Sequence, residues 1–214
     1  MSKKLLINIR GCNGSGKSTI PISMLNDPDM YVVEKPYKGK DRKIVTVFPT
    51  YGFVALGSYH NKCGGLDGYV VTDMVKKGMW YALKKFPEYH IIMEGVIPST
   101  VYSTYEKLFK EVQQKYPERL VVVLNLLPSV AECIHRIKLR NGGKPIKEDL
   151  VRSKWDAVHK NSVKFRQAGI ISLNWDNSGI WPKYASKPMV KHMMDFLRKE
   201  LKKDGKSKNA KVSK

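Results

Sequence analysis

Apolar residues follow two different spacings along the chain. Short apolar runs between turn residues predict buried strands, and apolar residues that recur every three or four positions predict helices. The predicted strands are residues 5–9, 31–33, 44–48, 51–56, 89–93, 120–127 and 170–173. The predicted helices are residues 19–26, 70–86, 101–112, 130–137 and 147–168, with a last helix capped by Ser186.

The alternation of strands and helices predicts the fold class. Such an order forms right-handed βαβ units, which build a parallel sheet with helices on both faces. We therefore expect a three-layer α/β/α fold with a mostly parallel sheet. Segments 44–48 and 51–56 flank a Pro49-Thr50 turn and predict a β-hairpin inserted beside this core. The polar, basic stretch 36–42 is expected to be a loop, and the glycine break at 141–145 a short lid.

A chain of 214 residues is long enough for one domain with a substantial core. We expect this domain to span residues 1–202. Residues 203–214 are rich in lysine and poor in apolar residues. They are therefore predicted to form a basic, disordered tail.

A glycine-rich segment lies between the first predicted strand and the first predicted helix. Its sequence is Gly11-Cys12-Asn13-Gly14-Ser15-Gly16-Lys17-Ser18, which matches the phosphate-binding loop, or P-loop. Glycines let successive backbone N–H groups point at phosphate oxygens, and the following helix adds its positive end. We expect Lys17 to reach the β- and γ-phosphates and the Ser18 hydroxyl to ligate Mg²⁺. The residues expected to hold ATP with Mg²⁺ are Gly11, Asn13, Gly14, Ser15, Gly16, Lys17, Ser18 and Thr19.

A glutamate follows the predicted strand 89–93. Ligands gather at the carboxyl ends of the strands of a parallel sheet, so Glu94 is a candidate site residue. Its carboxylate could hold Mg²⁺ or accept a proton from an attacking hydroxyl group, and the sequence leaves both roles open. The strand-like run 120–127 contains no acid, so it offers no second candidate.

Two arginines precede the predicted lid. Arg136 and Arg140 are one helical turn apart and share one face of the helix. Guanidinium groups at this place can neutralise the oxygens of a phosphoryl group during transfer. The alternative is an ordinary basic helix face, which is common in a chain with so many cations.

Residues 57–68 form a glycine-rich segment that contains aromatic and polar residues. Tyr59 and Asp67 are candidates to stack on a base and to read its edge, while the glycines at 64 and 65 let the backbone come close. A purely structural loop fits the spacing equally well. Asn61-Lys62 begins like a guanine-reading motif, but Gly64 stands where an aspartate is needed, which argues against a GTPase.

The formal net charge is +20. Seven lysines against Glu200 and Asp204 place +5 on residues 199–214, which leaves +15 on the rest of the chain. This excess of positive charge outside the tail indicates a polyanionic partner, most simply DNA or another nucleic acid. The alternative interpretation is a surface that is basic in general, without such a partner.

Three widely spaced cysteines show no metal-binding pattern and fit reduced thiols in a cytoplasmic compartment. The N-terminus leads directly into the first strand, so no signal peptide is expected. No apolar run approaches the roughly 20 residues of a membrane span.

The motifs above resemble those of the nucleoside and nucleotide kinase branch of P-loop proteins. The resemblance rests on the P-loop, the strand-end Glu94, and Pro128, Arg136 and Arg140 before a glycine break. It implies a P-loop kinase-like fold over roughly residues 4–177. In that branch the loop after the last strand often cradles adenine, a role that would fall on residues 174–177 here.

A narrower resemblance concerns residues 9–18, 56–59 and 63–67. These segments are similar to small phage kinases of DNA hypermodification, which phosphorylate the hydroxymethyl group of 5-hydroxymethyluracil in phage DNA. The resemblance implies an ATP-dependent kinase with DNA as its partner, acting in the host cytoplasm. A kinase of free deoxynucleosides or nucleoside monophosphates, and a nucleic-acid-binding NTPase, remain as alternatives.

Overall fold

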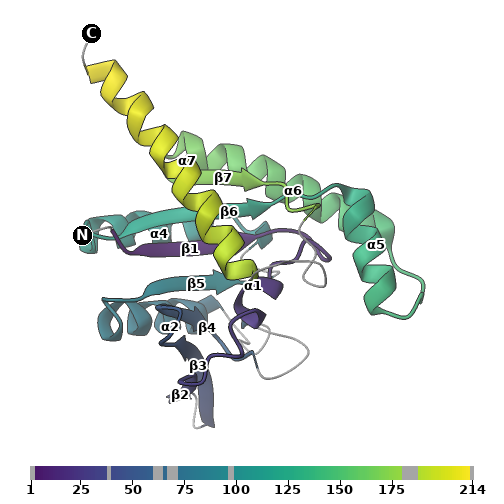
Figure 1. Ribbon diagram of the computed structural model, residues 1–214, viewed down its shortest axis with the longest axis horizontal. Helices are drawn as coiled ribbons and strands as arrows, with labels where there is room; N and C mark the ends of the chain where they lie inside the picture. Colours follow the sequence, from purple (N-terminus) through teal and green to yellow (C-terminus); the bar gives the residue numbers. More distant parts are fainter. Residues whose placement is uncertain are drawn as a thin grey trace.

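The computed structural model describes residues 3–37, 40–59, 65–66, 72–95, 99–179 and 188–212. Its centre is a seven-stranded sheet with strand order β2-β3-β4-β5-β1-β6-β7 (Figure 1). The strands are β1 (Leu5–Arg10), β2 (Tyr31–Tyr37), β3 (Lys40–Phe48), β4 (Phe53–Leu56), β5 (His90–Glu94), β6 (Leu120–Leu126) and β7 (Ile171–Trp175). The helices are α1 (Thr19–Ile22), α2 (Thr72–Lys85), α4 (Ser103–Lys115), α5 (Val130–Arg140), α6 (Glu148–Gln167) and α7 (Met189–Val212).

Helices cover both faces of the sheet, so the predicted three-layer α/β/α fold is confirmed. Apolar residues of α2 and α4, with Phe165 of α6, pack in one buried cluster against one face. Apolar residues of α1 and α7 pack in a second cluster against the other face, where α7 crosses the sheet in Figure 1. Along β1, Leu5, Ile7 and Ile9 belong to the second cluster and Leu6 to the first, which is the two-residue period of a strand buried on both faces.

The strands from β4 to β7 in the sheet order are parallel neighbours, and β2 and β3 add antiparallel pairs at one edge. The predicted hairpin is confirmed as β3–β4, and β4 joins it to the core because it also pairs with β5. The prediction of a loop over residues 36–42 was wrong, because β2 and β3 extend into this stretch. Antiparallel pairing satisfies the backbone of these polar residues, and oppositely charged Glu34 and Lys43 lie opposite each other.

Two ends of helices differ from the prediction. The helix predicted over residues 19–26 ends at Ile22, where turn-type bonds from Met24 N–H to the Pro21 carbonyl and from Leu25 N–H to the Ile22 carbonyl replace the helical pattern. At the C-terminus, α7 continues to Val212, where a disordered tail was predicted from residue 203. Lysine has a good helix propensity, and the packed first turns of α7 supply the nucleus. The division of the chain at residue 202 stays a prediction.

No helix in the described part of the chain has both the length and the apolar character to cross a membrane.

His90 begins β5 and packs its ring against Phe53, with ring centroids 5.1 Å apart. Its Nδ1 atom accepts a hydrogen bond of 3.0 Å from the backbone N–H of Leu5 on the neighbouring strand. Burial, together with the positive charges of Lys4, Arg119 and Arg198, lowers the pKa of His90 to about 4. The imidazole is therefore neutral in the folded protein at neutral pH.

We predict that His90→Asn weakens the pH dependence of folding. An unfolded histidine has a pKa of about 6.5, so the unfolded chain binds the proton more readily than the folded chain. The stabilisation of the folded state by neutral His90 is therefore fully present above the pKa of the unfolded histidine, and it is lost as the pH falls towards 4. Urea unfolding between pH 7 and pH 4 should show a smaller loss of unfolding free energy in the variant, whose amide oxygen can still accept from Leu5. Equal losses in both proteins would contradict the assignment.

Candidate active site

The P-loop connects β1 to α1 and curls through two residues with left-handed backbone angles. Gly14 has φ of 79° and Gly16 has φ of 92°, a conformation that glycine adopts without strain. A Cβ atom on Gly14 would lie 2.3 Å from the carbonyl oxygen of Cys133 on α5. Glycine is thus required at position 14 both for the curl and for the packing of the loop against α5.

The side chain of Lys17 lies within its own loop. It is 7% exposed, and its ammonium group donates to the carbonyl oxygens of Gly11 at 2.8 Å and Cys12 at 2.9 Å. The cation is therefore held beside the loop amides, where phosphate oxygens are expected. Because α1 has only four residues, the positive end of this helix contributes less than the sequence suggested, and the loop amides and Lys17 carry the attraction.

The two predicted metal ligands lie together. The Ser18 hydroxyl donates a hydrogen bond of 3.2 Å to Oε1 of Glu94, whose side chain is 1% exposed. The register of β1 and β5 explains why Ser18 and Glu94 are close: Ile9 of β1 pairs with Glu94 of β5, just before the P-loop begins. Hydroxyl and carboxylate oxygens are ligands that Mg²⁺ accepts. No group of three or more metal-binding side chains occurs among the described residues, so phosphate and water oxygens would have to complete the shell of an ion here.

Gly65 packs directly against Glu94, a contact that sequence reasoning missed. Its φ is 68°, and a Cβ atom there would lie 2.2 Å from Glu94 Oε1 and 2.9 Å from the hydroxyl oxygen of Tyr59. The Gly65 N–H donates to the Ser58 carbonyl at 3.0 Å, which fixes the approach. The sequence predicted a close backbone approach at 64 and 65, but towards a base rather than towards the strand-end acid.

Of the two candidate base-reading residues, the structure describes Tyr59 but not Asp67. Tyr59 is 2% exposed and belongs to the buried cluster that contains Phe48 and Ile92. The hydroxyl end of Tyr59 lies beside Gly65, while its ring is covered. Asp67 lies outside the described residues. The substrate-binding roles of Tyr59 and Asp67 stay predictions.

Arg136 lies against the P-loop. It is 4% exposed; its Nε donates to Glu132 at 2.7 Å, and Nη2 donates to the carbonyls of Asn177 at 3.1 Å and Ser178 at 3.2 Å. Its Nη1 would be 3.7 Å from a Cβ atom on Gly16. This guanidinium is thus held in one position beside the loop.

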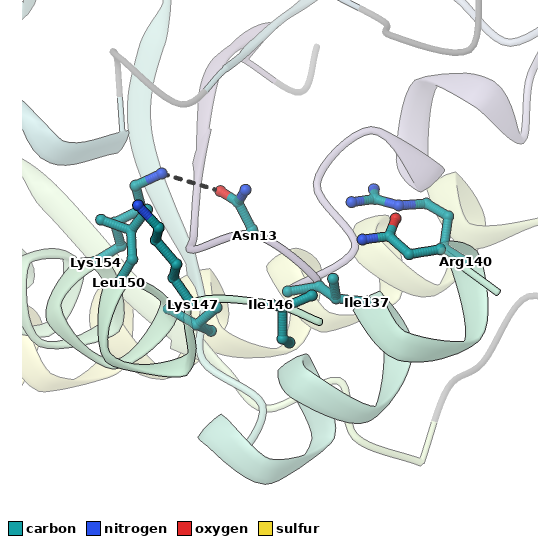
Figure 2. A pocket seen from close by; sticks show the side chains of 9 residues that line it. Asn13, Ile137, Arg140, Ile146, Lys147, Leu150 and Lys154 are labelled. Carbon is teal, nitrogen blue, oxygen red and sulfur yellow. Dashed lines mark hydrogen bonds between the residues drawn. The ribbon is translucent and has the colours of Figure 1, made fainter. Parts of the chain in front are cut away.

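Arg140 does not lie beside Arg136 at the P-loop. Its side chain is exposed at the end of α5 and lines a pocket that borders Asn13 (Figure 2). One helical turn separates a buried arginine from an exposed one, so the two predicted arginines occupy different environments. Their catalytic roles stay predictions.

Asn177 is a second contact that the sequence did not predict. It follows β7, is 1% exposed, and donates from Nδ2 to the Ser15 carbonyl at 3.0 Å. The loop after β7 therefore supports the P-loop from the side that also carries Arg136. The predicted adenine cradle at 174–177 remains an expectation.

Arg10, the last residue of β1, connects the P-loop to the end of β5. Its guanidinium donates to the Ser99 carbonyl at 3.1 and 2.7 Å and to the Val101 carbonyl at 2.9 Å. The Ser99 hydroxyl accepts from Gly11 N–H at 3.2 Å and donates to the Gly95 carbonyl at 2.5 Å. Burial lowers the pKa of Arg10 to about 9, so it remains charged at neutral pH. The only sequence signal was an arginine at the end of an apolar run.

Cys12 and Cys133 join the P-loop to α5 through a thiol–thiol contact of 3.4 Å. The hydrogen bond with Cys12 and then burial raise the pKa of the Cys133 thiol. A buried thiol that stays protonated is a packing group.

A P-loop at the carboxyl edge of a parallel sheet, facing a buried strand-end acid, defines a protein of the P-loop class. The model of the 5-hmdU DNA kinase family matches residues 2–171. The chain belongs to this family, and the resemblance to phage kinases of DNA hypermodification is confirmed.

Three relatives carry the same description. The 5-hmdU DNA kinase of Bacillus phage SP10 is 49% identical over 82% of this chain and 27% of its own length. The 5-hmdU DNA kinase 1 of Salmonella phage ViI is 35% identical over 75% of this chain and 70% of its own. The 5-hmdU DNA kinase of Pseudomonas phage M6 is 32% identical over 80% and 92%. The chain thus spans about a quarter of the length of the SP10 relative.

Among solved structures, a deoxyadenosine kinase from M. mycoides with bound dCTP is 18% identical and covers 90% of this chain and 98% of its own, with a TM-score of 0.36. A likeness at this score supports no functional assignment.

We predict that Gly65→Ala lowers turnover by about 10²-fold, the scale of a displacement of roughly 1 Å in a catalytic group. The added methyl group would meet Glu94 and push its carboxylate away from Ser18. Gly52→Ala is the matched control, because Gly52 has φ of 69° but nothing within 4 Å of an added Cβ. Steady-state phosphoryl transfer and thermal unfolding of both variants make the comparison. Equal turnover in the two variants would show that Gly65 does not act through Glu94.

Proposed function

We propose that the chain is an ATP-dependent kinase that phosphorylates the hydroxymethyl group of 5-hydroxymethyluracil in phage DNA, in the cytoplasm of the host. The observation that carries the proposal is the contact of 3.2 Å between Ser18 and Glu94. It occurs in a chain that belongs to the 5-hmdU DNA kinase family. The loop alone can bind phosphate, and an acid at this place can in addition hold Mg²⁺ or accept the proton of an attacking hydroxyl group.

ATP binding follows from the P-loop. The loop N–H groups donate hydrogen bonds to the phosphate oxygens, and Lys17 exchanges the carbonyls of Gly11 and Cys12 for the β- and γ-phosphate oxygens. Ser18 and Glu94 are the residues that would hold Mg²⁺, which neutralises charge between these two phosphates when bound. The exchange keeps the cation within a site that is already nearly closed to water.

In the transfer step, the hydroxymethyl oxygen of the acceptor forms a bond to the γ-phosphorus, and the bond to the bridging oxygen of ADP breaks. The proton of the attacking hydroxyl passes to Glu94 or to solvent. Burial of Glu94 at 1% exposure supports either a base or a metal ligand, since both benefit from exclusion of water.

Charge that develops on the transferring phosphoryl group is stabilised by Arg136 in this proposal. Glu132 and the carbonyls after β7 already fix its guanidinium, so little reorganisation is needed when charge develops. Arg140 is exposed at the end of α5, and its role in the transfer stays a prediction.

DNA as the carrier of the acceptor is supported by the net charge of +20. A base must leave the stack to reach a buried acid, at a cost of a few kcal/mol. Contacts of Lys and Arg with DNA phosphates offset this cost. A free nucleoside needs no such charge.

The test is transfer from γ-labelled ATP to oligonucleotides that contain 5-hydroxymethyluracil or thymine, and to the free 5-hydroxymethyl nucleoside and its monophosphate. We expect label in the hydroxymethyl oligonucleotide alone, with affinity that falls steeply with salt. Removal of residues 203–214 should weaken binding to both oligonucleotides equally, since lysines that contact backbone phosphates read no bases. Greater activity on the free nucleoside or nucleotide at every salt concentration would replace the proposal with a nucleoside or nucleotide kinase.

We expect Glu94→Gln to lower turnover by roughly 10²-fold or more, the scale of general-base catalysis. Retained binding of Mg·ATP would assign Glu94 to proton transfer, and weakened binding would assign it to the metal. Glu111→Gln, an exposed position on α4, is the control. Unchanged turnover in Glu94→Gln would remove the strand-end acid from the mechanism.

A further inference from the structure

A pocket of about 250 Å³ lies next to the P-loop. Asn13 of the P-loop forms one part of its wall, and the end of α5, the turn that follows and the start of α6 form the rest (Figure 2). Its apolar part consists of Ile137, Ile146, Leu150 and Val151. Leu150 is 49% exposed, which leaves apolar surface open to a ligand.

Three cations surround this apolar part. Arg140 lies on one side of Asn13, and Lys147 and Lys154 lie on the other (Figure 2). Lys154 donates from Nζ to Asn13 Oδ1 at 3.4 Å, so its charge lies directly beside the P-loop.

No carboxylate is among the residues that line the pocket in the described part of the chain. Of the nearby acids, Glu148 pairs with Lys138 at 2.8 Å and Glu132 pairs with Arg136, while Asp149 in the first turn of α6 does not line the pocket. Like charges around one hollow repel each other, and an anion relieves that repulsion. The pocket is therefore suited to an anionic group with an apolar neighbour.

This pocket is distinct from the place predicted for the triphosphate. Asn13 is the only P-loop residue that lines it, and Lys17, Ser18 and Arg136 do not. A ligand in the pocket would therefore lie next to the phosphates of ATP without replacing them.

We infer that Lys147 and Lys154 bind a backbone phosphate of DNA next to the target nucleotide, with a deoxyribose against Ile146 and Leu150. The inference rests on the proposed function. Of the participants in that reaction, a free nucleoside carries no phosphate, and ATP keeps its phosphates at the P-loop. The DNA strand is the participant that brings a further phosphate attached to an apolar sugar.

The consequence is a substrate preference set by position. A phosphate held beside Asn13 fixes an extruded nucleotide close to the γ-phosphate of ATP, which lowers the entropy cost of the transfer. Such a contact positions the strand and reads no base. DNA is thereby favoured over a free nucleoside at the same catalytic residues.

The test uses the full chain and a single-stranded oligonucleotide that contains 5-hydroxymethyluracil. Lys147→Ala/Lys154→Ala is compared with Lys84→Ala/Lys107→Ala, which removes the same charge from exposed positions on α2 and α4. Dissociation constants for the oligonucleotide without ATP, and for ATP without DNA, are measured over a salt series. Lys147→Arg/Lys154→Arg retains the charge and serves as the rescue variant.

We expect the pocket variant to bind the oligonucleotide about tenfold more weakly, the scale of one charge-assisted contact, and to lose about 0.7 from the salt slope. Its ATP affinity should equal that of the wild type, the control pair should retain both the affinity and the slope, and the arginine pair should restore DNA binding. Weaker ATP binding with unchanged DNA binding would assign the pocket to the nucleotide and overturn the inference. Failure of the arginine pair to restore binding would also overturn it. Phosphate transfer by the wild type tests the proposed function separately, because these binding measurements need no catalysis.

Discussion

The parallel pairing of β1 and β5 is the constraint on which the active site depends. Both strands end at the same edge of the sheet, and their register places Glu94 opposite Ile9, directly before the P-loop. The hydrogen bond from Ser18 to Glu94 follows from this register. A shift by one residue would turn Glu94 to the other face of the sheet and leave the P-loop without its acid.

Buried polar contacts hold this edge in place around the P-loop. Arg10 and Ser99 tie the start of the loop to the segment after Glu94, while Asn177 and Arg136 fix its middle. These contacts hold the loop in one position, which lowers the reorganisation required of the protein during transfer. Arg140, at the exposed end of α5, lies outside this network.

The α/β order, the P-loop and the strand-end acid were predictable because each leaves a local signal, such as glycine spacing or an apolar run that stops at an acid. The contacts of Gly65 with Glu94 and of Asn177 with Ser15 were not, since they join segments far apart in sequence. The extension of β2 and β3 into residues 36–42 was missed because cross-strand pairing, rather than an apolar period, determines it. The helical structure of residues 203–212 was missed because their lysine-rich composition indicates charge only. It does not show that these residues continue the packed helix α7.

A double-mutant cycle between Ser18 and Glu94 tests the central claim most directly. The measurement is kcat/KM for phosphoryl transfer by the wild type, Ser18→Ala, Glu94→Ala and the double variant at saturating Mg²⁺. If the two side chains act together on one metal-bound phosphate, the effects should be non-additive, with a coupling of about 0.5–3 kcal/mol. Effects that add within about 0.3–0.5 kcal/mol would show that the two residues act independently and would contradict the account.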